Sequence, residues 1–362
     1  MVYRALGLMS GSSLDGLDLS FAEFEVTGNR WSYQILSADC YEYTEEWMEK
    51  LRTAPQLSAA AYMQLHADYG QLLGTYVNRF IEAHQLQYKI QLIGSHGHTT
   101  FHSPATRLTH QLGDGAALAA ATGINVVSDL RNMDVALGGQ GAPIVPIGEK
   151  WLLQQYRYFL NIGGIANLSC NTEPYNAFDI CAANRVLNLL VQPTGQAYDE
   201  GGRLARSGQV NEALLRELND LAYYRQPFPK SLANEFGTDV VFPLIKEKGL
   251  PLADELCTYT EHIAQQLKAA IELLPSGNAT PGEQLLATGG GAFNTYLVER
   301  MQHYVPSIEI VVPDEQLINF KEALIMAFIA VLRWREEPNC LSSVTGAGRD
   351  SVGGAVWSGQ EW

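Results

Sequence analysis

Residues 6–18 read LGLMSGSSLDGLD, and the prediction of the fold starts from this segment. An apolar run enters a loop of serine and glycine, and after Gly16 apolar and polar residues alternate. This pattern predicts a β-hairpin with a small, hydroxyl-rich turn. Glycine and serine let a backbone approach a ligand and direct its N–H groups at an anion, so the turn is a candidate phosphate site. An ordinary tight hairpin is the alternative interpretation.

The composition narrows the class of protein. The chain has 362 residues, enough for two domains, and 46% of them are hydrophobic, which supplies large cores. The net charge of −15 argues against nucleic acid and against an anionic membrane surface as partners. Five scattered cysteines have no metal-binding spacing and predict reduced thiols in a cytoplasmic protein. We expect no leader segment, because the N-terminus enters a predicted strand at once, and no membrane span, because the apolar runs are short.

The order of the predicted elements indicates an α/β protein with two similar halves. Strands are expected over residues 3–9, 17–26 and 31–42, and helical spacing of apolar residues follows over 59–84. Residues 136–146, ALGGQGAPIVP, are typical of a loop or an inter-domain crossing. The pattern of strands and helices restarts after them, with a second glycine hairpin near its beginning.

The two halves of this pattern predict two lobes. We expect a first lobe of residues 1–130, with the C-terminal segment of about residues 348–362 packing back on it. The second lobe is expected to comprise residues 131–347. The duplication is inferred from the order of the elements, since no sequence repeat is visible.

Three glycine-rich turns follow apolar strands: SGSSLDG (10–16), NIGGIAN (161–167) and TGGGAFN (288–294). Two such hairpins can hold a polyphosphate with backbone N–H groups, and the third turn suits the nucleoside or the α-phosphate. No Walker A sequence is present. The candidate nucleotide-binding residues of these turns are Ser10, Gly11, Ser12, Ser13, Asp15, Gly16, Gly163, Gly164, Asn167, Gly289, Gly290, Gly291 and Asn294. Asp15 is also the candidate for holding Mg²⁺. Three purely structural turns are the alternative.

Asp179 is the candidate general base. It lies near the end of a predicted strand, shortly after the second glycine hairpin. A carboxylate at this position can accept a proton from an incoming nucleophile. The alternative is that Asp179 caps the helix that follows.

SHGHTTFHSP, residues 95–104, is a loop-like segment with three histidines after a predicted buried strand. It contains no carboxylate or thiolate, so we favour hydrogen bonding to a sugar over a metal site. A structural loop is a third interpretation.

Asp129, Arg131 and Asp134 follow the next predicted strand. Arg131 suits a carboxylate on a substrate, because its guanidinium matches that group in shape and charge. The alternative is a surface network of ion pairs with little energetic effect.

Taken together, the motifs resemble the anhydro-N-acetylmuramic acid kinase family, which recycles the bacterial cell wall and belongs to the sugar kinase/heat-shock protein/actin superfamily. The resemblance spans essentially the whole chain. Its most specific blocks are ALGGQGAPIVP (136–146) and NIGGIANLS (161–169). Further markers are residues 8–18, 95–104, 111–115, 128–146 (which contains the first of these blocks), 198–215, 229–237, 288–294, 321–328 and 341–347.

The resemblance implies two ribonuclease-H-like domains with ATP and Mg²⁺ in a cleft between them. In such enzymes ATP phosphorylates O6 of 1,6-anhydro-N-acetylmuramic acid while water opens the anhydro ring, which gives N-acetylmuramic acid 6-phosphate. The family's catalytic aspartate falls on Asp179, and its ATP loop falls on Ser10 to Asp18, so the resemblance adds Asp18 to the candidate nucleotide-binding residues. Positions expected to line the sugar pocket fall on His96, Thr99, Arg131, Asn184 and Glu322. We also expect a homodimer.

One segment departs from the family pattern. The usual sequence after the catalytic aspartate is Thr-Gly-Pro-Gly-Asn, whereas here Asp179 is followed by Ile180, Cys181, Ala182, Ala183 and Asn184. Loss of glycine restricts the backbone. Two alternatives therefore accompany the kinase interpretation: a kinase of the same fold for another amino sugar, or a nucleotide-binding protein with impaired catalysis.

Overall fold

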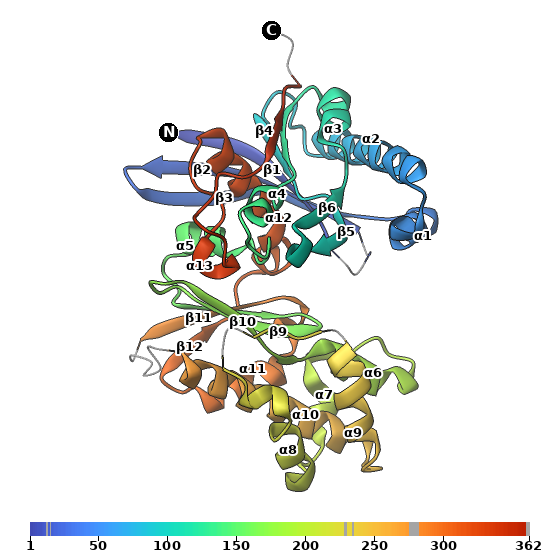
Figure 1. Ribbon diagram of the computed structural model, residues 1–362. Coiled ribbons are helices and arrows are strands. Elements are labelled where there is room, and N and C mark those ends of the chain that lie inside the picture. Colours follow the sequence, from blue (N-terminus) through green and yellow to red (C-terminus); the bar gives the residue numbers. More distant parts are fainter. Residues whose placement is uncertain (12–13, 15, 228–229, 234, 275–281, 360–362) are drawn as a thin grey trace. The chain divides into compact units, whose positions relative to one another are not determined.

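The computed structural model describes residues 1–11, 14, 16–227, 230–233, 235–274 and 282–359. The chain forms two compact units, which are drawn in Figure 1. Unit 1 comprises Met1–Leu153 together with Phe320–Trp362, and unit 2 comprises Gln154–Asn319. Each unit has its own sheet, so the α/β class predicted from the sequence is confirmed.

Unit 1 contains a six-stranded sheet of order β13-β7-β4-β1-β2-β3. The strands are β1 (Val2–Ser10), β2 (Gly16–Thr27), β3 (Arg30–Glu42), β4 (Leu92–Ser95), β7 (Asn125–Ser128) and β13 (Ala355–Trp357). The first three pair antiparallel, whereas β4 runs parallel to β1 and β7 parallel to β4. β13 brings the C-terminal segment onto this sheet by pairing antiparallel with β7.

Helices cover the sheet of unit 1. They are α1 (Glu45–Thr53), α2 (Ala59–Ala83), α3 (Gly115–Thr122), α4 (Asn132–Ala136), α5 (Pro146–Leu152), α13 (Ser342–Thr345) and the part of α12 (Glu315–Trp334) that begins at Phe320. α2 and α3 lie side by side in Figure 1 and enclose an apolar core with the sheet. α12 approaches β1 so closely that a Cβ at Gly7 would lie 1.7 Å from the carbonyl oxygen of Ala323. Glycine at this position therefore permits the packing of the helix on the sheet.

Unit 2 repeats this arrangement in a five-stranded sheet of order β10-β9-β8-β11-β12. The strands are β8 (Tyr158–Ile162), β9 (Ile165–Cys170), β10 (Asn176–Ala182), β11 (Glu283–Thr288) and β12 (Ile308–Val311). Again the first three are antiparallel and the last two are parallel to the first. The similarity between the halves, which the order of predicted elements indicated, is thus visible in the two sheets.

The helices of unit 2 are α6 (Asn184–Val191), α7 (Arg203–Ser207), α8 (Glu212–Asn219), α9 (Phe242–Lys246), α10 (Leu252–Leu273) and α11 (Thr295–Tyr304). α10 is the central one, and its buried residues join the strands in a single apolar core. In the part of the chain that the structure describes, we find no helix with the length and apolarity needed to cross a membrane.

The division between the units differs from the boundary at residue 130 that the sequence suggested. Residues 131–153 belong to unit 1 because long-range contacts tie them there. Glu149 of α5 forms a buried ion pair with Lys321 of α12 at 3.0 Å, and Asp134 of α4 accepts a hydrogen bond from Thr345 at 2.7 Å. Residues 136–146 therefore lie inside unit 1 and are not the crossing between lobes.

The interpretation of residues 95–104 as a loop is wrong. They contribute β5 (His98–Ser103), which pairs antiparallel with β6 (Leu108–Leu112) as a separate two-stranded sheet. The sequence pattern for a strand is weak here, because β5 consists mainly of histidine and threonine and its only large apolar residue is Phe101.

Candidate functional site

Two of the predicted nucleotide turns lie side by side in unit 2, with Asn184 between them. The Asn184 backbone N–H donates to the carbonyl oxygen of Gly163 at 3.1 Å, and its side-chain Nδ2 donates to that of Ile162 at 3.0 Å. On the other side, a Cβ at Gly291 would lie 3.0 Å from the Asn184 Oδ1. The first residue of α6 therefore joins the β8–β9 turn to the turn after β11.

The glycines of these turns differ in what surrounds them. A Cβ at Gly291 would lie 2.2 Å from Ile162, and Gly289 has a φ of +80°, so both glycines are required by the packing and the backbone. In contrast, a Cβ would meet nothing closer than 3.4 Å at Gly163, 3.7 Å at Gly164 or 3.9 Å at Gly290. These three positions leave open space beside backbone, which fits the close approach of a phosphate chain.

A row of polar residues crosses the sheet of unit 2 beside the turns. The strand register places Asp179 opposite Asn167, Asn167 opposite Asn161, and Asn161 beside Thr288. Among the described residues, nothing forms a hydrogen bond with the buried Thr288 hydroxyl. Because register partners project to the same face of a sheet, the predicted base and the predicted nucleotide residue Asn167 share one face.

Asp179 is held by a segment that the sequence analysis did not single out for chemistry. Its Oδ2 accepts a hydrogen bond from the Leu232 N–H at 2.8 Å, and its N–H donates to the Lys230 carbonyl oxygen at 3.1 Å. The Tyr223 hydroxyl donates to the Asp179 carbonyl oxygen at 2.7 Å. The only sequence signal for these contacts was the family marker at 229–237, which indicated importance but no role.

The environment of Asp179 favours a proton on its carboxyl group. Burial raises the pKa of Asp179, and the hydrogen bond from Leu232 opposes this only in part. The alternative that Asp179 caps α6 is wrong, because the N-cap residue is Ala183 and no side chain caps this helix. The carboxylate is therefore available for chemistry, with a pKa shifted toward neutral pH as a general base requires.

The segment that departs from the family pattern lies inside unit 2. Ile180, Cys181, Ala182 and Ala183 are all buried, and all belong to its apolar core. The thiol of Cys181 is deeply buried, which raises its pKa well above the usual range. The unusual side chains therefore fill the core and offer no surface to a ligand.

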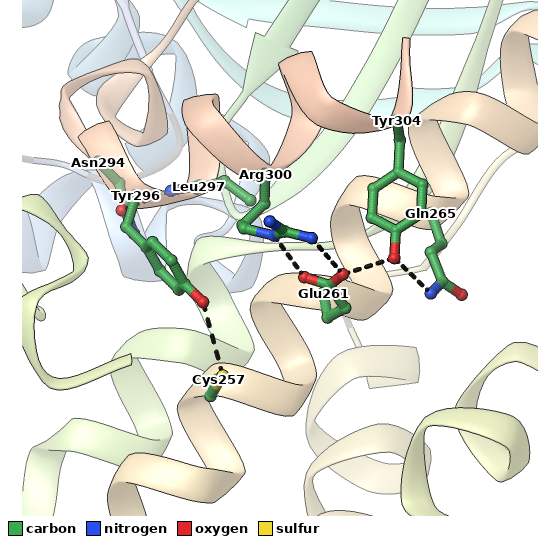
Figure 2. Close-up of polar contacts among 8 residues, drawn as sticks. All are labelled: Cys257, Glu261, Gln265, Asn294, Tyr296, Leu297, Arg300 and Tyr304. Atoms are coloured by element: carbon green, nitrogen blue, oxygen red, sulfur yellow. Dashed lines mark hydrogen bonds and ion pairs between the residues drawn. The ribbon is translucent and has the colours of Figure 1, made fainter. Parts of the chain in front are cut away.

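Asn294, the last predicted nucleotide residue, begins α11. Its Oδ1 accepts a hydrogen bond from the Leu297 N–H at 3.0 Å, which caps the helix. Figure 2 shows how α11 is fixed to α10 beyond this cap: the Arg300 guanidinium donates two hydrogen bonds of 2.8 Å to Glu261, and Tyr304 donates a third. The turn at 288–294 is thus connected to a helix that is anchored on the core.

In unit 1, the first predicted turn follows a buried polar network. The Ser10 hydroxyl accepts a hydrogen bond from Tyr43 at 2.8 Å and lies 3.1 Å from Nδ1 of His98. Gly11 is the next residue along the chain. Asp18 lies within β2, where it is the register partner of Met9. At Gly16 a Cβ would lie 2.7 Å from the Cys40 sulfur, so this glycine serves packing. Ser12, Ser13 and Asp15 lie outside the described residues.

Three of the predicted sugar-binding residues come together in unit 1. Nε of Arg131 donates to Nε2 of His96 at 2.9 Å, and Nδ1 of His96 contacts the Gly97 carbonyl oxygen at 2.8 Å. Burial and then the charge of Arg131 lower the pKa of His96 to about 3, so its ring is neutral with the proton on Nδ1. Burial lowers the pKa of Arg131 as well, while the charge of Glu322 opposes that shift.

Thr99 and Asp134, the other candidate residues of these segments, differ in their exposure. Thr99 is exposed on β5, where its hydroxyl accepts a long hydrogen bond of 3.4 Å from Gln111. Asp134 is buried and accepts hydrogen bonds from Gly141 and Thr345, so the interpretation of these charges as a surface ion-pair network is wrong. The described residues also contain no cluster of three metal-ligating side chains, which leaves the histidines without a metal site there.

Comparison with known proteins identifies relatives of the full chain. A family model described as anhydro-N-acetylmuramic acid kinase matches residues 3–359. The anhydro-N-acetylmuramic acid kinase of Synechococcus elongatus is 35% identical over 382 residues, which cover 98% of this chain and 99% of the relative. That of Saccharophagus degradans is 33% identical over 375 residues, which cover 98% of each. A solved structure, an activator of the 2-hydroxyisocaproyl-CoA dehydratase from Clostridium difficile with bound ADPNP, aligns with 92% of this chain and 96% of its own at 14% identity and a TM-score of 0.44.

Proposed function

Because this chain belongs to the anhydro-N-acetylmuramic acid kinase family, we propose that it phosphorylates 1,6-anhydro-N-acetylmuramic acid at O6. The phosphoryl donor is ATP, and water opens the anhydro ring in the same reaction. The product is N-acetylmuramic acid 6-phosphate.

One observation carries this proposal: a half-buried carboxylate with a raised pKa stands next to glycine turns that have open space beside them. Asp179 and Asn167 are register partners, and the residues after Asp179 bond directly to Gly163 and Gly164. A proton acceptor on the same sheet as glycine turns with open backbone suits a kinase that activates its nucleophile.

The roles of the residues follow from this arrangement. Asp179 accepts a proton from the water whose oxygen bonds to the anomeric carbon. As the bond between that carbon and O6 breaks, O6 becomes the acceptor, and bound MgATP supplies the γ-phosphoryl group it receives. In unit 2, Gly163, Gly164 and Gly290 would hold the nucleotide. In unit 1, Ser10 and Gly11 remain candidate nucleotide-binding residues.

We assign recognition of the sugar to His96, Arg131 and Glu322. Neutral His96 keeps the Arg131 guanidinium in one orientation, because its Nε2 can only accept a hydrogen bond. The remaining N–H groups of Arg131 suit the lactyl carboxylate of the sugar. Glu322 supplies a nearby negative charge, which opposes the lowering of the Arg131 pKa by burial.

The alternative of a different amino sugar has less support. It was motivated by the altered residues 180–183, and these side chains are buried in the core of unit 2. Side chains buried in this way are not placed to contact the sugar directly.

Phosphorus NMR with MgATP and the anhydro sugar tests the proposal. We expect a sugar 6-phosphate signal from the natural protein and a loss of kcat of at least 100-fold in Asp179→Asn, with ADP affinity retained. Near-normal kcat in Asp179→Asn would show that another group is the base. Nucleotide binding without any 6-phosphate from the natural protein would instead favour impaired catalysis.

Mg²⁺, assembly and location belong to the same proposal. We place Mg²⁺ on the nucleotide phosphates near Asp15, a residue outside the described part of the chain. We also propose a cytoplasmic homodimer. Light scattering on the purified protein measures the oligomeric state, and a monomer across the micromolar range would contradict the dimer.

A further inference from the structure

Arg185 lies beside the β8–β9 turn, and neither the motifs nor the family resemblance gave it a role. It is the second residue of α6, and its backbone N–H donates to the carbonyl oxygen of Gly164 at 3.4 Å. Its Nε lies 3.7 Å from the point that a Cβ of Gly164 would occupy. The guanidinium therefore borders the same open space that the absence of a side chain at Gly164 creates.

This guanidinium also differs from most others in unit 2. Arg157, Arg203, Arg206, Arg225 and Arg300 each form an ion pair with a carboxylate. Arg185 is exposed, and the described residues provide no carboxylate that neutralises it. In a chain with a net charge of −15, an uncompensated cation beside an anion-binding turn creates a local positive potential.

A structural role does not account for this side chain. The residues around it on α6, Val186 and Leu187, are buried in the core, whereas the Arg185 side chain projects to solvent. The support that the first turn of α6 gives to the glycine turn comes from backbone groups and from Asn184. Removing the guanidinium thus leaves those contacts in place.

We propose that Arg185 binds the phosphate chain of the nucleotide as an additional ligand of the β8–β9 turn. A guanidinium presents paired N–H groups whose spacing matches two phosphate oxygens, so it adds directed hydrogen bonds to those of the turn. This proposal rests on the proposed function only in that a nucleotide occupies the turn. It does not depend on which sugar is phosphorylated.

The test compares the affinities of adenosine, AMP, ADP and ATP for the full-length natural protein and for Arg185→Gln, measured by titration calorimetry. We expect ADP and ATP to bind roughly 10- to 100-fold more weakly to the variant, and adenosine to bind within about twofold of the natural value. Arg185→Lys should recover part of the loss, because lysine keeps the charge but not the paired geometry.

Arg216→Gln is the matched control. Arg216 is likewise an exposed arginine of unit 2, on α8. Removing its guanidinium should change neither the affinity for ADP and ATP nor the affinity for adenosine. Unchanged ADP affinity in Arg185→Gln would overturn the proposal. Equal weakening of adenosine and ADP would do so as well, since it would indicate a disturbed turn. A raised KM for the sugar with an unchanged KM for ATP would assign Arg185 to the sugar carboxylate and also overturn it.

Together with the phosphorus NMR assay, these affinities separate this proposal from the proposed function. If the natural protein binds ADP through Arg185 but transfers no phosphoryl group to the anhydro sugar, the proposed reaction fails and the role of Arg185 stands. If the natural protein binds no adenine nucleotide, both fail.

Discussion

Asp179 and His96 show at the residue scale how one physical cause prepares two different groups. Burial penalises the charged form of each side chain, so it raises the pKa of Asp179 and lowers that of His96. The carboxylate gains affinity for a proton, as a base at neutral pH needs. The imidazole loses its affinity for one and becomes a fixed hydrogen-bond acceptor for Arg131.

The acidic limb of the pH–rate profile tests the state of Asp179. A base with a raised pKa loses activity on acidification earlier than an ordinary aspartate, so the limb of kcat/KM should lie above pH 4. Leu232→Pro removes the N–H that lowers this pKa and should move the limb to still higher pH. Ala233→Pro, one residue further, is the control and should leave the limb where it is. A limb at the same pH in both variants and the natural protein would contradict the role of the Leu232 hydrogen bond.

The sequence could point to residues that belong to a local motif. It could not show which distant residues contact them. The sequence singled out Asp179 and the glycine turns as candidates, because strand ends and small residues leave a local pattern. It could not identify Tyr223, Lys230 or Leu232, since they reach Asp179 over separations of more than 40 residues. Arg185 was missed because an exposed arginine in a helix has no distinguishing pattern.

At the scale of elements, the position of a turn is set by the helix attached to it. The turn at 288–294 leads into α11, and α11 is anchored on α10 by Glu261, Arg300 and Tyr304 (Figure 2). Burial alone would raise the pKa of Glu261, but hydrogen bonds from Arg300 and Tyr304 and the charge of Arg300 lower it below its usual value. The Glu261 carboxylate is thus ionised, and the positive charge of Arg300 compensates its negative charge.

Arg300→Met should destabilise unit 2 by roughly 2 kcal/mol at pH 7, because it leaves the buried Glu261 carboxylate without its cation. The lowered pKa means that this stabilisation is complete above the unfolded value of about 4.3 and is lost as the pH falls through the folded value. The difference from the natural protein should therefore shrink below about pH 4. Urea unfolding at pH 7 and at pH 3.5 measures it. Arg206→Met, which removes an exposed pair with Glu299, is the control and should change stability little; an equal loss in both variants would contradict the prediction.

The elements themselves were predicted to different degrees. β1, β2 and β3 and the long α2 agree closely with the sequence pattern, because alternation and helical spacing are strong in them. β5 and β6 were missed because β5 carries histidine and threonine where alternating apolar residues would reveal a strand.

At the scale of the whole molecule, the two units have separate apolar cores. Leu73 lies fully buried in the core of unit 1, and Leu267 fully buried in that of unit 2. The order of strands and helices was readable from the sequence, but the division between units was not. It depends on long-range contacts such as that between Glu149 and Lys321 and on the pairing of β13 with β7.

Separate cores predict two unfolding transitions in calorimetry. Leu73→Ala and Leu267→Ala each leave a cavity and should cost about 2–5 kcal/mol, but each should lower the midpoint of a different transition. A single transition shifted equally by both variants would show that the units unfold as one.

The pairing of β13 with β7 has a consequence for the order of events during synthesis. All residues of unit 2 leave the ribosome before residues 320–359, which complete unit 1. Until then the nascent chain exposes the open edge of β7 and the face of β1 that α12 later covers. The half of the protein that is translated first is therefore the half whose folding is completed last.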